Sequence, residues 1–318
     1  MSENYHCFLW PEIVSKFPII AVVRCCPIMQ SIIFAVIALC GWGTGDVGGV
    51  IAARRLGSVR ATTMVFIWTT LLLTLFIPFN SIRLSTLLSG YSLFNCLLGL
   101  ILIGCYIAFV EALRTGNPSI IGTICGGFPA LVIVLSIIFL GDHLDKRQVV
   151  IIVSIFAGLF LSSSDAQAAR ATKVHLDRSI FLALVTLCGW GIYFTFVKIP
   201  IRHIGPFWTF YLQNILGCII LVLWNRGRDL RFRKKEALGH WAAAGAAVAG
   251  GGGTVAYYIA VAHGSTALVA GIAGPYPVLF VLLSSLVFKQ KITRIQNIGM
   301  IITLVGISAL ALTSSLTT

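Results

Sequence analysis

The chain alternates between long apolar stretches and short polar breaks. Each stretch is close to the ~20 residues that a helix needs to cross the hydrocarbon core of a bilayer. The pattern predicts five spans in the first half and five in the second, at about residues 30–52, 61–79, 92–113, 118–140, 148–164, 179–200, 207–224, 238–262, 266–288 and 294–312. We therefore predict an all-α integral membrane protein with ten transmembrane helices.

The two halves of the chain are versions of one sequence. The pentapeptide Leu-Cys-Gly-Trp-Gly at residues 39–43 recurs 148 positions later, at residues 187–191. The same offset pairs Pro129 with Pro277 without a gap. Internal repetition of this kind indicates one structural unit used twice. The expected division is an N-terminal tail (1–28), a first five-helix repeat (29–164), a polar linker (165–178) and a second five-helix repeat (179–314), with Met29 as an alternative start of the protein.

The odd number of spans in each repeat sets the expected topology. After five crossings the second repeat must enter the membrane from the opposite side, so the two repeats are inverted. Inverted repeats around a cavity at the bilayer midplane are typical of secondary transporters. Channels can arise from the same kind of duplication, and a channel-like pore or a non-transporting membrane protein remains the alternative.

Composition agrees with a lipid environment. The 318 residues are 58% hydrophobic and 10% charged, with a mean hydropathy of +0.96, whereas soluble domains carry about 25% charged residues. The net charge of +13 comes from Lys and Arg in short loops between apolar spans, where they contact anionic lipid head groups. No basic patch with interleaved aromatic residues is present, so we expect no nucleic-acid partner.

The chain lacks the motifs of the usual catalytic and metal sites. It has no CxxC pair, no histidines at metal-ligand spacing and no GxxxxGK[ST] phosphate loop, and most of its nine cysteines lie inside apolar spans, where thiols behave as small hydrophobic groups. We therefore expect no enzyme activity, no cofactor and no metal. A membrane enzyme is the least favoured alternative.

Asp46 is the first candidate for a functional residue. It lies within the first span, one turn after Trp42 and on the same helical face. A carboxylate in hydrocarbon is costly, which favours a position facing a cavity. There it would contact a substrate amine or couple transport to protons. The alternative is a structural acid paired with Arg54 or Arg55. Its equivalent in the second repeat is Phe194, so such a site is asymmetric.

Three other polar residues in the spans are weaker candidates. Glu111, in the last turn of span three, either contacts substrate or pairs with Arg114 at the interface. Lys198 is expected to snorkel to the head groups, with anion binding as the alternative. His263 is expected to be an interfacial polar residue, with a proton relay as the alternative.

Aromatic residues and glycines complete the candidate cavity. The expected cavity residues are Trp42, Asp46, Tyr106, Glu111, Trp190, Tyr193, Gly252, Tyr257 and Tyr276. Four glycines at 250–253 weaken a helix interior by about 1 kcal/mol each relative to Ala, which predicts a kink that lines the cavity or packs tightly. Pro129, Pro277 and Gly251 are candidate hinges, with simple kinks as the alternative. For each aromatic residue the alternative is helix packing or an interfacial belt.

The motifs resemble a known family. The Gly-Trp-Gly of the first span, the run from Glu111 to Ser119, and Phe128-Pro129 are similar to the EamA-type repeat of the drug/metabolite transporter superfamily. The second copy continues the pattern with Tyr258, Gly264 and Tyr276-Pro277. The resemblance covers nearly the whole chain from Met29 to Leu312. Two positions depart from it, because the family usually has Glu where this chain has Asp142 and Gln290.

The resemblance implies a carrier of small metabolites such as amino acids, nucleosides or drugs. We expect an alternating-access secondary transporter in a bacterial plasma (inner) membrane, acting as a monomer or weak homodimer, with protons as a candidate coupling ion. Orientation is left open. The distribution of Lys and Arg favours both termini outside, whereas the resemblance implies cytoplasmic termini.

Overall fold

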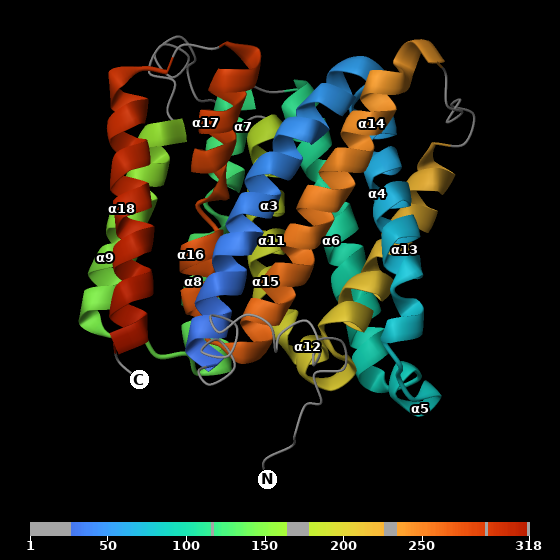
Figure 1. Ribbon diagram of the computed structural model, residues 1–318, viewed down its shortest axis with the longest axis horizontal. Helices are drawn as coiled ribbons and strands as arrows, with labels where there is room; N and C mark the ends of the chain where they lie inside the picture. The colour runs from blue at the N-terminus through green and yellow to red at the C-terminus, as the bar shows by residue number, and fades with distance from the viewer. Residues whose placement is uncertain (1–26, 116–117, 164–177, 226–233, 290–291, 317–318) are drawn as a thin grey trace, which may run out of the picture.

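A computed structural model describes residues 27–115, 118–163, 178–225, 234–289 and 292–316, and these residues form helices joined by short turns without strands (Figure 1). Most of the expected tail (1–28) and linker (165–178) lies outside the described residues. Eight helices or helix pairs in the described part are long and apolar enough to cross a membrane: Pro27–Leu56, Ser58–Leu75, Gly90–Leu113, Arg178–Ile204, Pro206–Trp224, Ala237–His263, Thr266–Phe288 and Arg294–Ser314.

The helices of the first repeat are α3 (Pro27–Leu56), α4 (Ser58–Leu75), η1 (Ile77–Phe79), α5 (Leu84–Leu87), α6 (Gly90–Thr115), α7 (Pro118–Cys125), α8 (Phe128–Leu140) and α9 (Lys146–Ser163). Those of the second repeat are α11 (Arg178–Phe196), α12 (Lys198–Ile204), α13 (Pro206–Trp224), η2 (Lys234–Glu236), α14 (Ala237–Ala246), η3 (Ala247–Gly251), α15 (Gly252–His263), α16 (Thr266–Ala273), α17 (Tyr276–Phe288) and α18 (Arg294–Leu316).

The predicted fourth and ninth spans are each broken at the same place. α7 gives way to α8 just before Pro129, and α16 gives way to α17 just before Pro277. Each proline lies in the first turn of the new helix, where its missing N–H leaves no hydrogen bond unmade. The breaks are therefore encoded twice, once in each repeat.

Apolar side chains cover the outside of the bundle. On α6 the exposed Leu93, Leu97 and Leu100 recur at helical spacing, and on α18 Ile301 and Val305 are each more than 60% exposed. Exposed apolar surface on this scale is unfavourable in water and favourable in lipid. The chain is a multi-pass membrane protein.

The first helix of each repeat packs against the other repeat. α3 contacts α14, α15, α16 and α17, and α11 contacts their repeat equivalents α6, α7 and α8. α9 and α18, the last helices of the two repeats, pack along each other at one side of the bundle (Figure 1). The pairing follows the repeat, so the two halves interlock through equivalent surfaces.

The first glycine of each Gly-Trp-Gly motif permits this interlocking. A side chain on Gly41 would meet the backbone of Gly253 on α15, with its Cβ 2.7 Å from the Gly253 Cα. A side chain on Gly189 would meet the sulfur of Cys105 on α6. Gly253 and Cys105 are themselves equivalent in the repeat, so one contact has been built twice.

The second glycine of each motif accommodates a leucine. A Cβ on Gly43 would lie 3.0 Å from the side chain of Leu279 on α17, and one on Gly191 would lie 2.5 Å from Leu131 on α8. Leu279 and Leu131 are again repeat equivalents. Small residues at such positions let helices approach closely in lipid, where packing drives association.

The glycine run of α15 serves mainly this close packing. Between α14 and α15 the helix widens into a π-helical segment over Ala247–Gly251, which is a local distortion at the glycine run. A Cβ on Gly45 of α3 would lie 2.8 Å from the backbone of Gly250. A Cβ on Gly251 would lie 3.2 Å from Thr69. Gly252 is exposed and has no atom near its missing side chain.

The helix ends gather at two opposite ends of the bundle. The lower end is where α3 begins and α12 lies, at the bottom of Figure 1, and the upper end is where α3 ends and α11 begins. At the lower end Ser31 of α3 donates a hydrogen bond to the carbonyl of Ala260 on α15 (3.0 Å).

Substitution of the interlocking glycines tests this packing. Gly41→Ala should lower the free energy of unfolding by about 1–3 kcal/mol, the usual cost of overpacking, because backbone atoms block the new methyl group. Gly189→Ala should cost less, since only the movable thiol of Cys105 stands in the way. Both are measured by thermal unfolding in detergent.

Gly49→Ala is the matched control on the same helix. A Cβ on Gly49 meets no atom within 4 Å, and Ala favours a helix by about 1 kcal/mol over Gly. Equal melting temperatures for Gly41→Ala and Gly49→Ala would contradict the packing described above.

Candidate functional site

Asp46 lies on the inner face of α3. The exposed Val36 and Cys40 mark the face of this helix that is turned to lipid, whereas the helical period places Asp46 with Ala35 and Leu39 on the other side. Ala35 and Leu39 are buried, at 0% and 7% exposure. Asp46, further along the same inner face, is nevertheless exposed. Space is therefore accessible inside the bundle at this level.

Asp46 has no polar partner within the described part of the chain: the ion pairs found there do not include it, nor do the hydrogen bonds. The guanidinium of Arg54 lies over the ring of Phe288 instead, 4.2 Å from its centroid. The structure therefore does not support the alternative in which Asp46 pairs with Arg54.

The accessible space beside Asp46 is also bordered by Gly49. Gly49 follows one turn later on the same face, and no atom lies within 4 Å of its missing side chain. We call this accessible space beside Asp46 and Gly49 the Asp46 recess.

Aromatic rings fill the interior next to the recess. Trp42 lies one turn below Asp46, and its ring centroid is 5.1 Å from that of Tyr257 and 5.5 Å from that of Tyr276. Its indole N–H donates a hydrogen bond to the hydroxyl of Thr254 (3.1 Å). These contacts join α3, α15 and α17.

Trp190 repeats this arrangement in the other half, with one difference. Its ring packs on Phe109 and Phe128, at 5.3 and 5.6 Å, which are the repeat equivalents of Tyr257 and Tyr276. Thr254 accepts the hydrogen bond of Trp42, and the residue equivalent to Thr254 beside Trp190 is Tyr106. The buried indole N–H of Trp190 is left without an acceptor among the described residues.

The position equivalent to Asp46 is filled by an aromatic ring. Phe194 contacts Trp42 at 5.7 Å, Phe128 at 5.0 Å and Tyr257 at 5.2 Å between ring centroids. Phe194 therefore plugs the interior on the lower side. At the corresponding place on the upper side, the smaller carboxylate of Asp46 leaves space.

A buried polar network lies beneath the plug. Tyr193 and Tyr258 both donate hydrogen bonds to the Gln213 side-chain oxygen, at 2.6 and 2.7 Å, and their hydroxyl groups also contact each other. The Gln213 amide donates to Asn95 (2.7 Å), which donates to the carbonyl of Thr209 (3.1 Å). The network ties α6, α11, α13 and α15 together.

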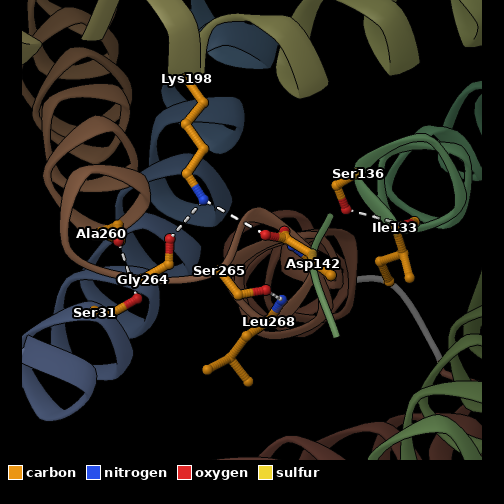
Figure 2. A network of polar contacts seen from close by, with 10 residues as sticks. Ser31, Ile133, Ser136, Asp142, Lys198, Ala260, Gly264, Ser265 and Leu268 are labelled. Atoms are coloured by element: carbon orange, nitrogen blue, oxygen red, sulfur yellow. Dashed lines mark hydrogen bonds and ion pairs between the residues drawn. The ribbon is translucent and has the colours of Figure 1, made fainter. Parts of the chain in front are cut away.

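A buried ion pair closes the lower end (Figure 2). The ammonium of Lys198 lies 3.6 Å from a carboxylate oxygen of Asp142 and donates a hydrogen bond to the Gly264 carbonyl (3.0 Å). Both side chains are less than a tenth exposed. The prediction that Lys198 snorkels to the head groups was wrong, because an acid and a carbonyl within the bundle satisfy its charge.

Asp142 holds both repeats at this point. Its second oxygen accepts a hydrogen bond from the backbone N–H of Ala267 (2.9 Å), in the first turn of α16. The charge is also favoured there by the positive end of the helix. Asp142 follows α8 in the first repeat, whereas Lys198 and Ala267 belong to the second. We call the Lys198–Asp142 pair with its Gly264 and Ala267 contacts the lower latch.

The lower latch has no equivalent at the upper end. The repeat partners of Lys198 and Asp142 are Val50 and Gln290, which cannot form an ion pair. Two ion pairs at the upper end join helices that are already neighbours: Arg60–Glu236 (2.8 Å, α4 to η2) and Arg178–Glu111 (3.9 Å, α11 to α6). Their side chains are more exposed than those of the latch.

The remaining candidates lie in different places. Glu111 faces Arg178 at the upper end, and the side chain of its expected partner Arg114 lies outside the described set. Gly252 falls on the outer stripe of its span together with Trp241 and Val248, which are 65% and 60% exposed. His263 is exposed at the lower end, with its ring nitrogen near the carbonyl of Ile259.

Sequence reasoning missed Gln213, Asn95 and the pairing of Lys198 with Asp142. A signal was available for the first two: Asn95 is an amide inside an apolar span, and Gln213 lies beside a second amide, Asn214, in another. Such residues in lipid are buried with partners. Nothing in the sequence indicates which residues those partners are.

Removing the lysine of the latch should be strongly destabilising. Lys198→Met leaves the Asp142 carboxylate buried without its cation, and breaking a buried pair costs about 3–5 kcal/mol. The double variant Lys198→Met/Asp142→Asn should recover much of this loss, because no unpaired charge remains. Lys146→Met, which removes an exposed lysine, is the control. Unfolding in detergent measures all four proteins, and equal losses in the single and double variants would contradict the pairing.

Comparison with known proteins places this architecture. A solved crystal structure superposes on 90% of this chain and 97% of its own, with a TM-score of 0.74 at 14% sequence identity, so the fold is shared. No curated protein matches the sequence. The sequence model of the EamA-like transporter family matches twice, over residues 29–164 and 177–312. The chain therefore belongs to the EamA-like transporter family, within the drug/metabolite transporter superfamily.

Proposed function

We propose that the protein is a secondary active transporter that moves a small organic metabolite by alternating access. The substrate would be of the size of an amino acid, a nucleoside or a drug-like solute, and protons are a candidate coupling ion. The proposed setting is a bacterial inner membrane, crossed ten times by two inverted five-helix repeats.

Inversion is supported by the ends at which the repeats begin. α3 starts at the lower end, where Ser31 donates a hydrogen bond to the Ala260 carbonyl in the last turn of α15. α11, its repeat equivalent, starts at the upper end near Glu111 and leads down to α12 and Lys198. Equivalent helices thus run in opposite directions, as alternating access through inverted repeats requires.

The observation that carries the proposal is the difference between the two sides of the interior. Phe194 and the buried tyrosine–glutamine network fill the lower side, and the lower latch ties the repeats together below them. Nearer the upper end, the inward carboxylate of Asp46 is exposed and has no aromatic ring in its place. One side closed and one side accessible is the geometry of a carrier at one stage of its cycle, and a pore would need a continuous path.

Flux measurements separate a carrier from a pore. The purified protein in liposomes, tested with a panel of radiolabelled amino acids, nucleosides and amines, should show saturable uptake of at least one solute. Unlabelled solute inside the liposomes should accelerate that uptake by counterflow. Flux that rises linearly with concentration and shows no counterflow would contradict the transporter assignment.

The lower latch should bias which side is accessible. In a variant whose native cysteines are replaced, Gly49→Cys should react with a membrane-impermeant maleimide added at the upper side. Asp142→Asn weakens the latch, so the lower-closed state should be less populated and the labelling rate at this cysteine should fall several-fold. A shift of 1.4 kcal/mol corresponds to about tenfold in the equilibrium constant.

Asp145→Asn is the matched control for this substitution. Asp145 is an exposed acid three residues away that caps α9, and Asn retains the capping ability. Equal labelling rates in the Asp142→Asn and Asp145→Asn proteins would mean that the latch does not govern access.

A further inference from the structure

We propose that the Asp46 recess binds a small organic ammonium ion whose positive charge lies between the Asp46 carboxylate and the neighbouring aromatic rings. The inference rests on the proposed function, since it names the substrate class of the same cavity. It follows from three features of the recess: an unpaired acid, nearby aromatic faces, and the absence of the ring that fills the equivalent place in the second repeat.

The acid requires a cation. A carboxylate at membrane depth is costly unless a partner compensates its charge. Within the described residues Asp46 has no such partner, and the nearest guanidinium of its own helix, Arg54, is engaged with Phe288. The site is therefore complementary to a positive group brought by the ligand, and it would repel a carboxylate or a phosphate.

The surroundings favour an organic cation over a metal ion. A metal would need several oxygen, nitrogen or sulfur ligands, and no group of three His, Cys, Asp or Glu side chains occurs in the described ranges. Asp46 instead lies one turn from Trp42, whose ring contacts those of Tyr257 and Tyr276 at 5.1 and 5.5 Å between centroids. The faces of Trp and Tyr rings attract ammonium groups through their quadrupoles.

Trp190 differs from its repeat equivalent in the hydrogen bonding of its indole N–H. The ring of Trp190 lies 5.6 Å from that of Tyr106, and its indole N–H has no acceptor although the side chain is only 8% exposed. Its repeat equivalent, Trp42, satisfies the same N–H with Thr254. The Trp190 nitrogen is buried, so its unpaired N–H does not contribute to ligand binding in the accessible recess.

The repeat comparison explains why the recess is on one side only. Phe194 fills the place equivalent to Asp46 and contacts three other rings. At position 194 the interior is occupied by an aromatic ring and its neighbours, so no space for a ligand is left there. Replacing the ring by a small acid in the first repeat provides both the space and the charge.

Binding of matched probes tests the charge requirement. Benzylamine and benzyltrimethylammonium should raise the melting temperature of the full-length protein in detergent, since ligand that binds the native state stabilises it. Benzyl alcohol and benzoate, which keep the ring but lose the positive charge, should not. Asp46→Asn should weaken binding of both cations about tenfold or more, because both lose their Coulomb attraction to the carboxylate.

The variants control for misfolding. Asp46→Asn replaces an unpaired acid, so its melting temperature without ligand should be at least that of the wild type, whereas Asp46→Glu should keep cation binding. Asp145→Asn should bind both cations as the wild type does. Equal affinity for benzylamine and benzyl alcohol, or unchanged cation binding in folded Asp46→Asn, would overturn the proposal.

The two proposals fail in different ways. Saturable counterflow of a neutral or anionic solute, without any effect of the cations on melting temperature, would remove the ammonium site and leave the transporter intact. Cation binding that depends on Asp46, without saturable flux of any solute in liposomes, would leave the site intact and remove the transporter.

Discussion

The close contact between the first helix of each repeat and the third helix of the other is the constraint on which the structure depends. Hydrocarbon gives helices no hydrophobic reason to associate, so they must gain stability from van der Waals packing. Gly41 against Gly253 and Gly189 against Cys105 bring the paired helices within reach of each other. Every aromatic contact at the centre, including those of Trp42 and Trp190, depends on that approach.

Symmetry of the packing makes its exceptions informative. Trp42 and Trp190 have nearly the same ring neighbours at nearly the same distances, so the scaffold is a faithful duplicate. Charge and hydrogen bonding are not duplicated. The repeat equivalent of Asp46 is Phe194, that of Lys198 is Val50, and that of Tyr106 is Thr254. Two inverted halves of identical chemistry would close equally well at either end. The unequal residues give the two ends different properties.

Much of the fold could be predicted from the sequence, and part of the site could not. Apolar length and the repeat predicted the helices, and the paired prolines predicted the breaks before α8 and α17, because these features act locally. Asp46 was identifiable since an acid inside a span has few explanations. Lys198 was misjudged because its partner, Asp142, follows a different helix in the other repeat. Long-range pairing of this kind is determined by how the helices pack in the folded bundle, and the hydrophobic periodicity of the sequence carries no information about it.

The energetics of a buried ion pair suit a closure that must also open. Removing Lys198 and Asp142 from water costs about as much as their attraction returns, so the net contribution of an intact pair is small. The cost becomes large only when one charge is left without the other. Opening the lower end admits water to both charges together, and hydration of the two charges then replaces their attraction for each other. A pair of this kind makes closure specific for one arrangement of the repeats. The free energies of the closed and open states can still differ by only a few kcal/mol, so that both states are populated.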